Sequence, residues 1–178
     1  MRNLLLALFA AAVAALPLSS RAAPLVEISG GVGSQLQPSV ERAPTNLMVA
    51  PGWGLAGFLK LELGVAAALG DVRNAKADVE LRPMVVVSPP LFPLYARGIL
   101  AVQNLVNGPT QLAYGGALGL SFGIPLTGFG VFAEVGALPR NVKVDAATGA
   151  PVFGAATAPT RDEFRWFAEG RAGVSYGF

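Results

Sequence analysis

Alternation of apolar and polar residues constrains the fold of this chain more than any other feature of its sequence. Near the C-terminus the apolar residues share one parity and the charged residues share the other: Trp166, Ala168, Gly170, Ala172, Val174, Tyr176 and Phe178 against Arg165, Phe167, Glu169, Arg171, Gly173, Ser175 and Gly177. Residues 59–69 repeat the pattern, with Leu, Val or Ala at the odd positions and Lys60 and Glu62 among the even ones. Since successive side chains of a β-strand point to opposite faces, this period predicts strands with one apolar and one polar face.

Further segments of similar length follow the same pattern with varying clarity. They are residues 24–33, 47–56, 79–88, 93–102, 112–122 and 129–138, which brings the expected number of strands to eight. The 22 glycines, the 14 prolines and the low charged fraction of 13% also suit many short strands separated by turns. The sequence therefore predicts an all-β chain of eight antiparallel strands.

The segments between the expected strands alternate in length. The long and polar connections are about residues 34–46, 70–78, 103–111 and 139–163, and the short ones centre on residues 57, 88–92 and 123–128. Outer-membrane barrels have short periplasmic turns and longer extracellular loops. This rhythm favours an up-and-down barrel, and each strand has about the 9 to 11 residues that a tilted strand needs to cross a bilayer. Both termini would then lie on the periplasmic side.

The N-terminal residues have the three parts of a secretory signal. Met1-Arg2-Asn3 is positively charged, residues 4–16 are continuously apolar, and residues 17–23 are small or polar. We expect cleavage after Ala22, which gives a signal peptide of residues 1–22 and one barrel domain of residues 23–178. The apolar run is shorter than the about 20 residues of a membrane-spanning helix, so a retained anchor is the weaker interpretation.

The charges of the expected mature chain are balanced and scattered. Without Arg2 and Arg21, 11 basic residues face 11 acidic ones, and no basic stripe is present, so we expect no nucleic-acid partner. The chain has no cysteine, which excludes disulfides and an N-terminal lipid on cysteine.

Ten charged residues are expected on the faces opposite the apolar stripes. They are Glu27, Lys60, Glu62, Glu80, Arg82, Arg97, Glu134, Arg165, Glu169 and Arg171. The interior of an eight-stranded barrel is only wide enough for side chains to fill, and an unpaired buried ion costs several kcal/mol. Five acids and five bases are therefore expected of a plugged interior, with the apolar faces turned outward. Glycines on the same faces would leave room for the long charged side chains.

The last strand resembles the terminal-strand signal of bacterial outer-membrane proteins. The residues that carry the resemblance are Trp166, Val174, Tyr176 and the terminal Phe178. In strand count and loop rhythm the mature chain is similar to the small OmpA/OmpX-type barrels, which implies a Gram-negative cell envelope, contact with outer-membrane lipid and recognition by the barrel assembly machinery. Pro51 and Pro83 depart from the pattern, because proline has no N–H to give a barrel ladder, and we expect bulges or shorter strands there.

No residue set predicts catalysis, a metal site or a cofactor. Barrel enzymes that resemble this chain in size, such as lipid A palmitoyltransferases and deacylases, use a histidine, and this chain has none. No Ser-Lys nucleophile stands out and the acids are scattered, so we expect a non-enzymatic barrel without metal or cofactor. A wide porin is also disfavoured, because an aqueous lumen needs about 16 strands.

Three functions remain open from the sequence. The first is a structural or surface-interaction barrel that meets an extracellular partner through residues 139–163, where a turn at residues 147–150 would let the last two strands continue as a hairpin. The second is a secreted soluble lipocalin-like barrel with the apolar faces inward and an apolar ligand. The third is a narrow gated outer-membrane channel.

Overall fold

The computed structural model describes residues 23–36, 42–55, 57–69, 78–89, 92–106, 110–149 and 159–177. All regular elements within these ranges are β-strands, so the all-β prediction is confirmed. The predicted signal peptide, residues 1–22, and the terminal Phe178 lie outside the described residues.

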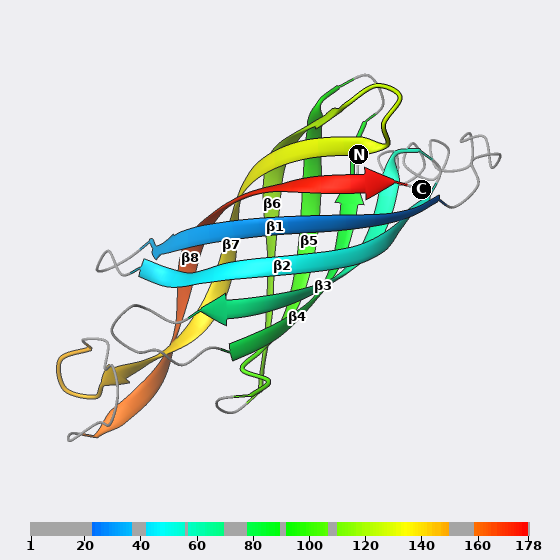
Figure 1. Cartoon of the computed structure of the whole chain (residues 1–178). Helices are drawn as coiled ribbons and strands as arrows, with labels where there is room; N and C mark the ends of the chain where they lie inside the picture. Colours follow the sequence, from blue (N-terminus) through cyan, green and yellow to red (C-terminus); the bar gives the residue numbers. More distant parts are fainter. Residues whose placement is uncertain are drawn as a thin grey trace, which may run out of the picture.

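The strands form one closed barrel in which each strand pairs antiparallel with its neighbours in the chain and the last pairs with the first (Figure 1). The eight strands are β1 (Ala23–Gln35), β2 (Arg42–Leu55), β3 (Leu59–Leu69), β4 (Asp78–Val87), β5 (Leu94–Gln103), β6 (Gln111–Gly123), β7 (Phe129–Asp145) and β8 (Thr160–Gly177). The predicted eight-stranded up-and-down barrel is therefore confirmed. Closure gives every strand two partners and removes the long edges of an open sheet.

The even number of strands brings the start of β1 and the end of β8 to the same end of the barrel (Figure 1). The connections at this end, residues 56–58, 88–93 and 124–128, are short. Gly57 and Gly128 have φ angles of 71° and 73°, the left-handed region that tight turns need and that glycine adopts without a steric penalty. We call this end the short-turn end.

Two of the predicted long connections are shorter than expected, because the strands beside them are longer. Strands β1 and β2 pair as far as Ser34 opposite Arg42, so much of residues 34–46 is strand. Strands β7 and β8 pair as far as Asp145 opposite Thr160, so both ends of residues 139–163 are strand as well.

The paired ends of β7 and β8 project beyond their neighbours as a two-stranded ribbon (Figure 1). Pairing of β6 with β7 stops at Gly116 opposite Ala137, and pairing of β1 with β8 stops at Gln35 opposite Phe167. We call residues 138–145 and 160–166 the β7–β8 extension. The sequence predicted that the last two strands continue as a hairpin with its turn at residues 147–150; the strands do continue, but β8 begins only at Thr160, and residues 150–158 lie outside the described part of the chain.

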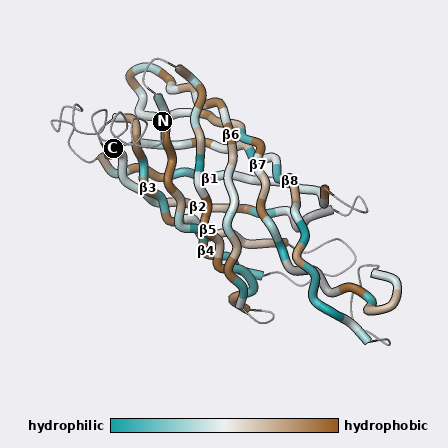
Figure 2. Tube along the Cα trace, turned by 180° about the vertical axis from the view of Figure 1, so that it is seen from behind, coloured by the Kyte–Doolittle hydropathy of each residue, from teal (hydrophilic) through white to brown (hydrophobic). Residues whose placement is uncertain are grey.

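Most large apolar side chains of the barrel strands point outward and most charged ones inward, while two apolar clusters, one of them with Met48 and Met84 and the other with Phe132, are buried inside. On β3, Leu61 is exposed and the next residue, Glu62, is buried. On β8, Val174 is exposed and Arg171, three residues earlier, is buried. The alternation is visible as apolar and polar segments following one another along the strands (Figure 2). The exposed large apolar residues of the strands include Ile28, Val49, Leu63, Val65, Val85, Leu100, Leu118, Val131 and Val135.

The strands run through both prolines with no shift of register, so the expectation of bulges or shorter strands at Pro51 and Pro83 is wrong. Pro51 pairs with Val26 of β1, and Pro83 pairs with Leu63 of β3. A strand can hold a proline at a position where the missing N–H would have donated a hydrogen bond to only one of the two adjacent strands. On the other side of each proline the pairing is interrupted.

Inward-facing glycines make room for large side chains. A Cβ atom on Gly119 would lie 2.6 Å from the hydroxyl of Tyr95, and one on Gly64 would lie 2.7 Å from the sulfur of Met48. At these two positions the space is taken by Tyr and Met, whereas the sequence suggested long charged side chains. The interior is therefore packed by alternating small and large residues, as in other narrow barrels.

Substitution of an inward glycine should destabilise the barrel, whereas the same change at an outward glycine should not. A Cβ on Gly173 would lie 2.7 Å from Cβ of Ser29 and 2.8 Å from Cζ of Phe132, so Gly173→Ala should lower the free energy of unfolding by about 1–3 kcal/mol through overpacking. Gly170→Ala on the same strand is the control, because its Cβ would have only Val32 O, at 3.9 Å, nearby. Urea unfolding followed by tryptophan fluorescence measures both, and equal midpoints would contradict the packing.

Candidate functional site

The polar interior of the barrel is the candidate site, because the inward parity of the strands collects its charged side chains there. Nine of the ten charged residues predicted for the interior are buried: Glu27, Glu62, Glu80, Arg82, Arg97, Glu134, Arg165, Glu169 and Arg171. The tenth, Lys60, keeps 30% of its side chain exposed, since it lies one residue into β3 at the short-turn end.

Arg97 of β5 holds three carboxylates. Its Nη2 lies 2.7 Å from Oε2 of Glu27, its Nη1 2.5 Å from Oε2 of Glu62, and its Nε 2.9 Å from Oε2 of Glu134. Lys60 Nζ reaches the other oxygen of Glu27 at 3.9 Å. These five residues form the Arg97 cluster, in which three acids meet two bases. A guanidinium suits this position because its planar fork offers several N–H donors at once.

Two aromatic rings flank the guanidinium of Arg97. The centroids of Tyr95 and Phe132 each lie 5.6 Å from its central carbon, and the two rings meet edge to face with centroids 6.5 Å apart. The hydroxyl of Tyr95 donates a hydrogen bond of 2.7 Å to Oε2 of Glu134. The rings add cation–π attraction and exclude water, which fixes the orientation of Arg97.

Arg82 of β4 forms a second cluster nearer the other end. Its Nη2 and Nε lie 2.7 Å and 3.0 Å from Oε2 of Glu80, and its Nη1 lies 3.3 Å from Oε1 of Glu169. Arg140 of β7 pairs with the second oxygen of Glu80, and the amide of Asn46 donates to Glu169. These five residues form the Arg82 cluster, in which each carboxylate has at least two partners.

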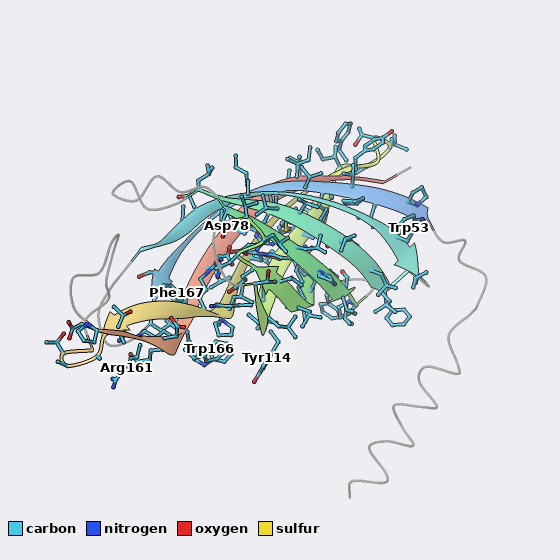
Figure 3. All side chains as sticks on the ribbon, turned by 90° about the horizontal axis from the view of Figure 1, so that it is seen from below. Trp53, Asp78, Tyr114, Arg161, Trp166 and Phe167 are labelled. Carbon is cyan, nitrogen blue, oxygen red and sulfur yellow. The ribbon has the colours of Figure 1, made fainter. Side chains whose placement is uncertain are left out.

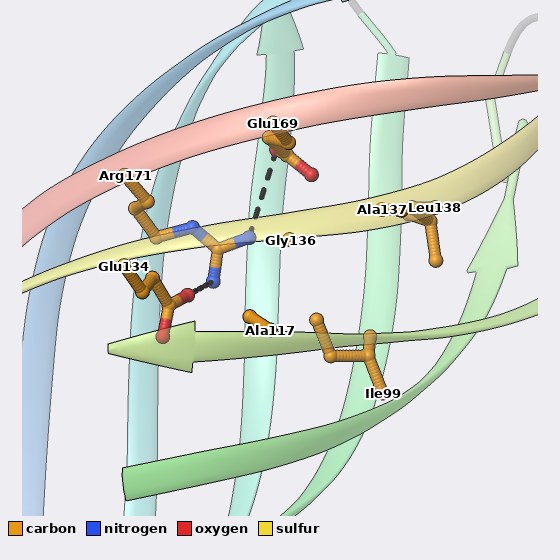
Figure 4. Close-up of a pocket in the computed structure, with 8 residues that line it drawn as sticks. All are labelled: Ile99, Ala117, Glu134, Gly136, Ala137, Leu138, Glu169 and Arg171. Carbon is orange, nitrogen blue, oxygen red and sulfur yellow. Dashed lines mark ion pairs between the residues drawn. The ribbon is translucent and has the colours of Figure 1, made fainter. Parts of the chain in front are cut away.

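Arg171 of β8 joins the two clusters (Figure 4). Its Nη1 lies 3.2 Å from Oε1 of Glu134 in the Arg97 cluster, and its Nη2 lies 3.6 Å from Oε1 of Glu169 in the Arg82 cluster. Beside it lies a cavity of about 10 Å³, lined also by Ile99 and Ala117, which has room for about one water molecule. The contacts therefore continue along the interior with little free volume at this point.

Together these contacts make one continuous chain of ion pairs, which we call the ion-pair chain. It runs through Lys60, Glu27, Arg97, Glu134, Arg171, Glu169, Arg82, Glu80 and Arg140, with Glu62 as a branch on Arg97. It contains five acids and five bases. Equal numbers of opposite charges are what burial demands, because each ion needs a partner away from water.

The composition of the ion-pair chain differs from the prediction at two positions. Arg140 belongs to it, although the sequence assigned Arg140 to a loop; its inward parity, shared with Glu134 on the same strand, was the signal. Arg165 is buried but lies in the β7–β8 extension, where it pairs with Glu163 at 2.7 Å and donates to Gly149 O at 2.8 Å. The contacts of Arg165 therefore stabilise the β7–β8 extension and are not part of the ion-pair chain.

The residues of β8 that resemble a terminal-strand signal lie along the outer surface of this strand. Trp166 and Val174 are exposed, and Tyr176 packs against Phe129 with ring centroids 4.7 Å apart. Trp166 also meets Phe164 edge to face at 6.4 Å. In Figure 3 Trp166 and Tyr114 lie toward one end of the barrel and Trp53 toward the other.

The tip of the β7–β8 extension is fixed by Asp145. Its carboxylate accepts hydrogen bonds from the backbone N–H groups of Thr148, at 2.8 Å, and Ala147, at 2.9 Å. These bonds lower the pKa of Asp145 below its ordinary value, so the turn keeps this support at neutral pH and loses it as the carboxylate is protonated in acid.

The described part of the chain contains no group of three or more metal-ligating side chains close enough to hold an ion. The same described residues include no helix long and apolar enough to span a membrane. Each charged residue of the ion-pair chain has at least one oppositely charged partner, so the arrangement balances charge within the interior.

These features define a class of protein: closed, up-and-down antiparallel barrels of eight strands, with an apolar outer surface and a charged, packed interior. Among solved structures, the N-terminal β-barrel domain of Pseudomonas aeruginosa OprF has the same fold, with a TM-score of 0.52 over 89% of this chain and 100% of that one. The sequence identity is 16%, so the likeness concerns the fold alone. No family model matches the sequence. No curated protein matches it either.

Removal of the central cation should cost far more than removal of the peripheral one. Arg97→Met leaves Glu27, Glu62 and Glu134 without their shared partner, and breaking a buried ion pair in this way costs about 3–5 kcal/mol. Lys60→Gln removes a partly exposed contact of 3.9 Å and should cost less than about 1 kcal/mol.

Chemical unfolding of the purified barrel checks this difference. Adding Glu62→Gln to Arg97→Met should restore part of the lost stability, because it removes one of the unpaired negative charges. Equal losses for Arg97→Met and Lys60→Gln would show that the ion-pair chain carries little of the stability.

Proposed function

We propose that this chain is a non-enzymatic integral outer-membrane β-barrel of a Gram-negative cell envelope. The observation that carries the proposal is the separation of side chains across the barrel wall, with large apolar residues outside and ion pairs inside. In water this arrangement would leave an apolar surface far larger than soluble monomers tolerate. In a bilayer the same surface meets lipid, and closure pairs the strands with one another.

A soluble barrel that carries an apolar ligand is the poorer explanation. Such a protein needs an apolar lumen with space for its ligand. The interior here instead holds the guanidinium groups of Arg82, Arg97 and Arg171 with their carboxylate partners. Its apolar interior cluster, which includes Met48, Met84 and Ile99, is packed and buried.

The aromatic side chains support membrane placement. Trp53, Phe122 and Phe129 are exposed near the short-turn end, and Tyr114 and Trp166 are exposed toward the other end (Figure 3). Aromatic residues gather at the two membrane–water boundaries of outer-membrane barrels. With short turns on the periplasmic side, both termini are periplasmic and the β7–β8 extension is extracellular.

We also propose that the interior is plugged. The ion-pair chain crosses from β1 and β5 to β4, β7 and β8, so side chains from opposite walls meet in the middle. An eight-stranded barrel has no room for an aqueous channel once such side chains fill it.

The biological role then rests with the outer surface. We assign a structural or surface-interaction role to the extracellular connections, above all residues 139–163, whose partner would be outside the cell. Outer-membrane lipid surrounds the barrel, and the barrel assembly machinery reads the last strand during biogenesis. No cofactor takes part.

Partition and gel migration test the membrane placement. The protein should stay with the outer-membrane fraction and enter the detergent phase, and an unheated sample should migrate differently on a gel from a heated one. Recovery in the aqueous phase with no heat-dependent shift would refute the proposal in favour of a soluble carrier.

A charge on the outer face near mid-bilayer should impair insertion. Ala172 is exposed on β8, and an arginine there costs about 2–4 kcal/mol at the bilayer midplane, so Ala172→Arg should reduce the heat-shifted band. Ala146→Arg at the exposed tip of the extension is the control and should leave the band unchanged. An unchanged band for Ala172→Arg would argue against a lipid-facing position.

The plug predicts an electrically silent barrel. In planar-bilayer recordings the purified protein should show no steady conductance, whereas a wide general porin in the same bilayers should conduct. Steady channels from the wild-type barrel would replace the plug with the narrow gated channel.

A further inference from the structure

The two prolines that interrupt the pattern of the sequence lie in one row across the barrel wall. Leu63 of β3 pairs with Pro83 of β4. The register of β2 and β3, in which Val49 meets Val65, places Pro51 opposite Leu63 on the other side. The prolines thus flank a single residue of the strand between them.

The hydrogen-bonded ladder is interrupted beyond both prolines. Pairing of β2 with β3 goes from Val49 opposite Val65 to Gly52 opposite Glu62, which leaves out Ala50 and Pro51. Pairing of β4 with β5 goes from Leu81 opposite Val102 to Met84 opposite Ile99, which leaves out Arg82 and Pro83. A proline without N–H cannot close the ladder on that side, so the wall is locally loosened at the β2–β3 and β4–β5 seams, on either side of the intact β3–β4 seam.

A hollow of about 740 Å³ lies on the outer surface over this region. Residues that line it include Trp53, Leu61, Leu63, Pro83, Gly98 and Leu100. Its lining is nearly all apolar. Glu62 also borders the hollow, but its side chain is fully buried against Arg97, so only its backbone contributes.

The hollow runs obliquely from the short-turn end toward the middle of the wall. Trp53 lies close to the end of β2, and Leu61 is the third residue of β3, so both are near the short turns. Gly98 and Leu100 lie in the middle of β5. Since Gly98 has no side chain and its Cβ would have only Val85 O, at 3.9 Å, nearby, it keeps the hollow open.

We propose that this hollow is a binding site for one acyl chain of a phospholipid from the leaflet on the side of the short turns. An acyl chain needs no hydrogen bonds, matches an apolar lining and fits the volume range of small-ligand sites, about 300–1,000 Å³. The indole of Trp53 stands where the chain would leave the hollow for its headgroup, at the level where tryptophan favours the membrane boundary.

The inference rests on the membrane placement of the proposed function. It goes beyond that placement, because the other outward faces of the barrel meet lipid without holding a particular chain. The loosened seams and the missing side chain at residue 98 distinguish this one face.

Filling the hollow tests the site. Gly98→Leu should occupy it, and Gly170→Leu is the matched control, since Gly170 is an outward glycine of β8 whose Cβ would have only Val32 O, at 3.9 Å, nearby. Native mass spectrometry of detergent-purified barrel with added palmitoyl-oleoyl phosphatidylethanolamine measures the bound lipid. Wild type and Gly170→Leu should carry one lipid, and Gly98→Leu should lose it. No lipid on wild type, or equal retention by the two variants, would overturn the proposal.

The two tryptophans of the chain give a second test, in which Trp53 in the lining of the hollow serves as the reporter and Trp166 as the reference. In Trp166→Phe the remaining Trp53 reports on the hollow, and in Trp53→Phe the remaining Trp166 reports on bulk lipid. In vesicles containing a low fraction of acyl-brominated phosphatidylethanolamine, Trp53 should be quenched several-fold more than Trp166. Equal quenching of the two tryptophans would contradict a retained acyl chain. In the mass-spectrometry experiment, a dimer mass without bound lipid would overturn the proposal, because a second copy of the protein would then occupy the hollow.

Failure of the site and failure of the membrane proposal are separable. A heat-dependent gel shift in wild type and all four variants shows that each is a folded membrane barrel. Loss of lipid retention with the shift intact therefore concerns the hollow alone, whereas absence of the shift in wild type refutes the proposed function itself.

Discussion

A charge sealed within a narrow barrel has no water to solvate it, and this constraint governs most of the interior. Arg97 pairs with three carboxylates, and Arg171 pairs with one carboxylate in each of the two clusters. Arg82 pairs with one carboxylate from its own strand and one from across the lumen. The alternation of the strands delivers these groups to the inside, and closure brings opposite walls within reach. The result is a core held by paired ions where most proteins of this size use apolar packing.

The outer surface follows from the same alternation. Each inward charge has an outward apolar neighbour, so a charged interior and an apolar exterior are two sides of one pattern. The row of Pro51 and Pro83, where the wall departs from regular pairing, is also where the exterior is hollowed.

Much of the fold could be predicted from the sequence, because period-two alternation and turn residues are local signals. The strand number, the pairing order and the inward position of Glu62, Arg97 and Arg171 follow from parity. Partners do not, because the tilt of the strands decides which residues meet across the lumen. Arg140 was missed for a related reason, since the extension of β7 past its neighbour depends on pairing with β8 and not on a local pattern.

The position of β8 in the ion-pair chain has a consequence for the order of events as the chain is made. This strand is synthesised last, yet it brings Glu169 to Arg82 and Asn46, and Arg171 to Glu134. Until it arrives, Arg82 lacks Glu169 and keeps Glu80, and Glu134 lacks Arg171 and keeps Arg97. Closure of the cylinder and joining of the two clusters are thus a single event, and a truncated barrel would be left both open-sided and with its ion-pair chain divided in two.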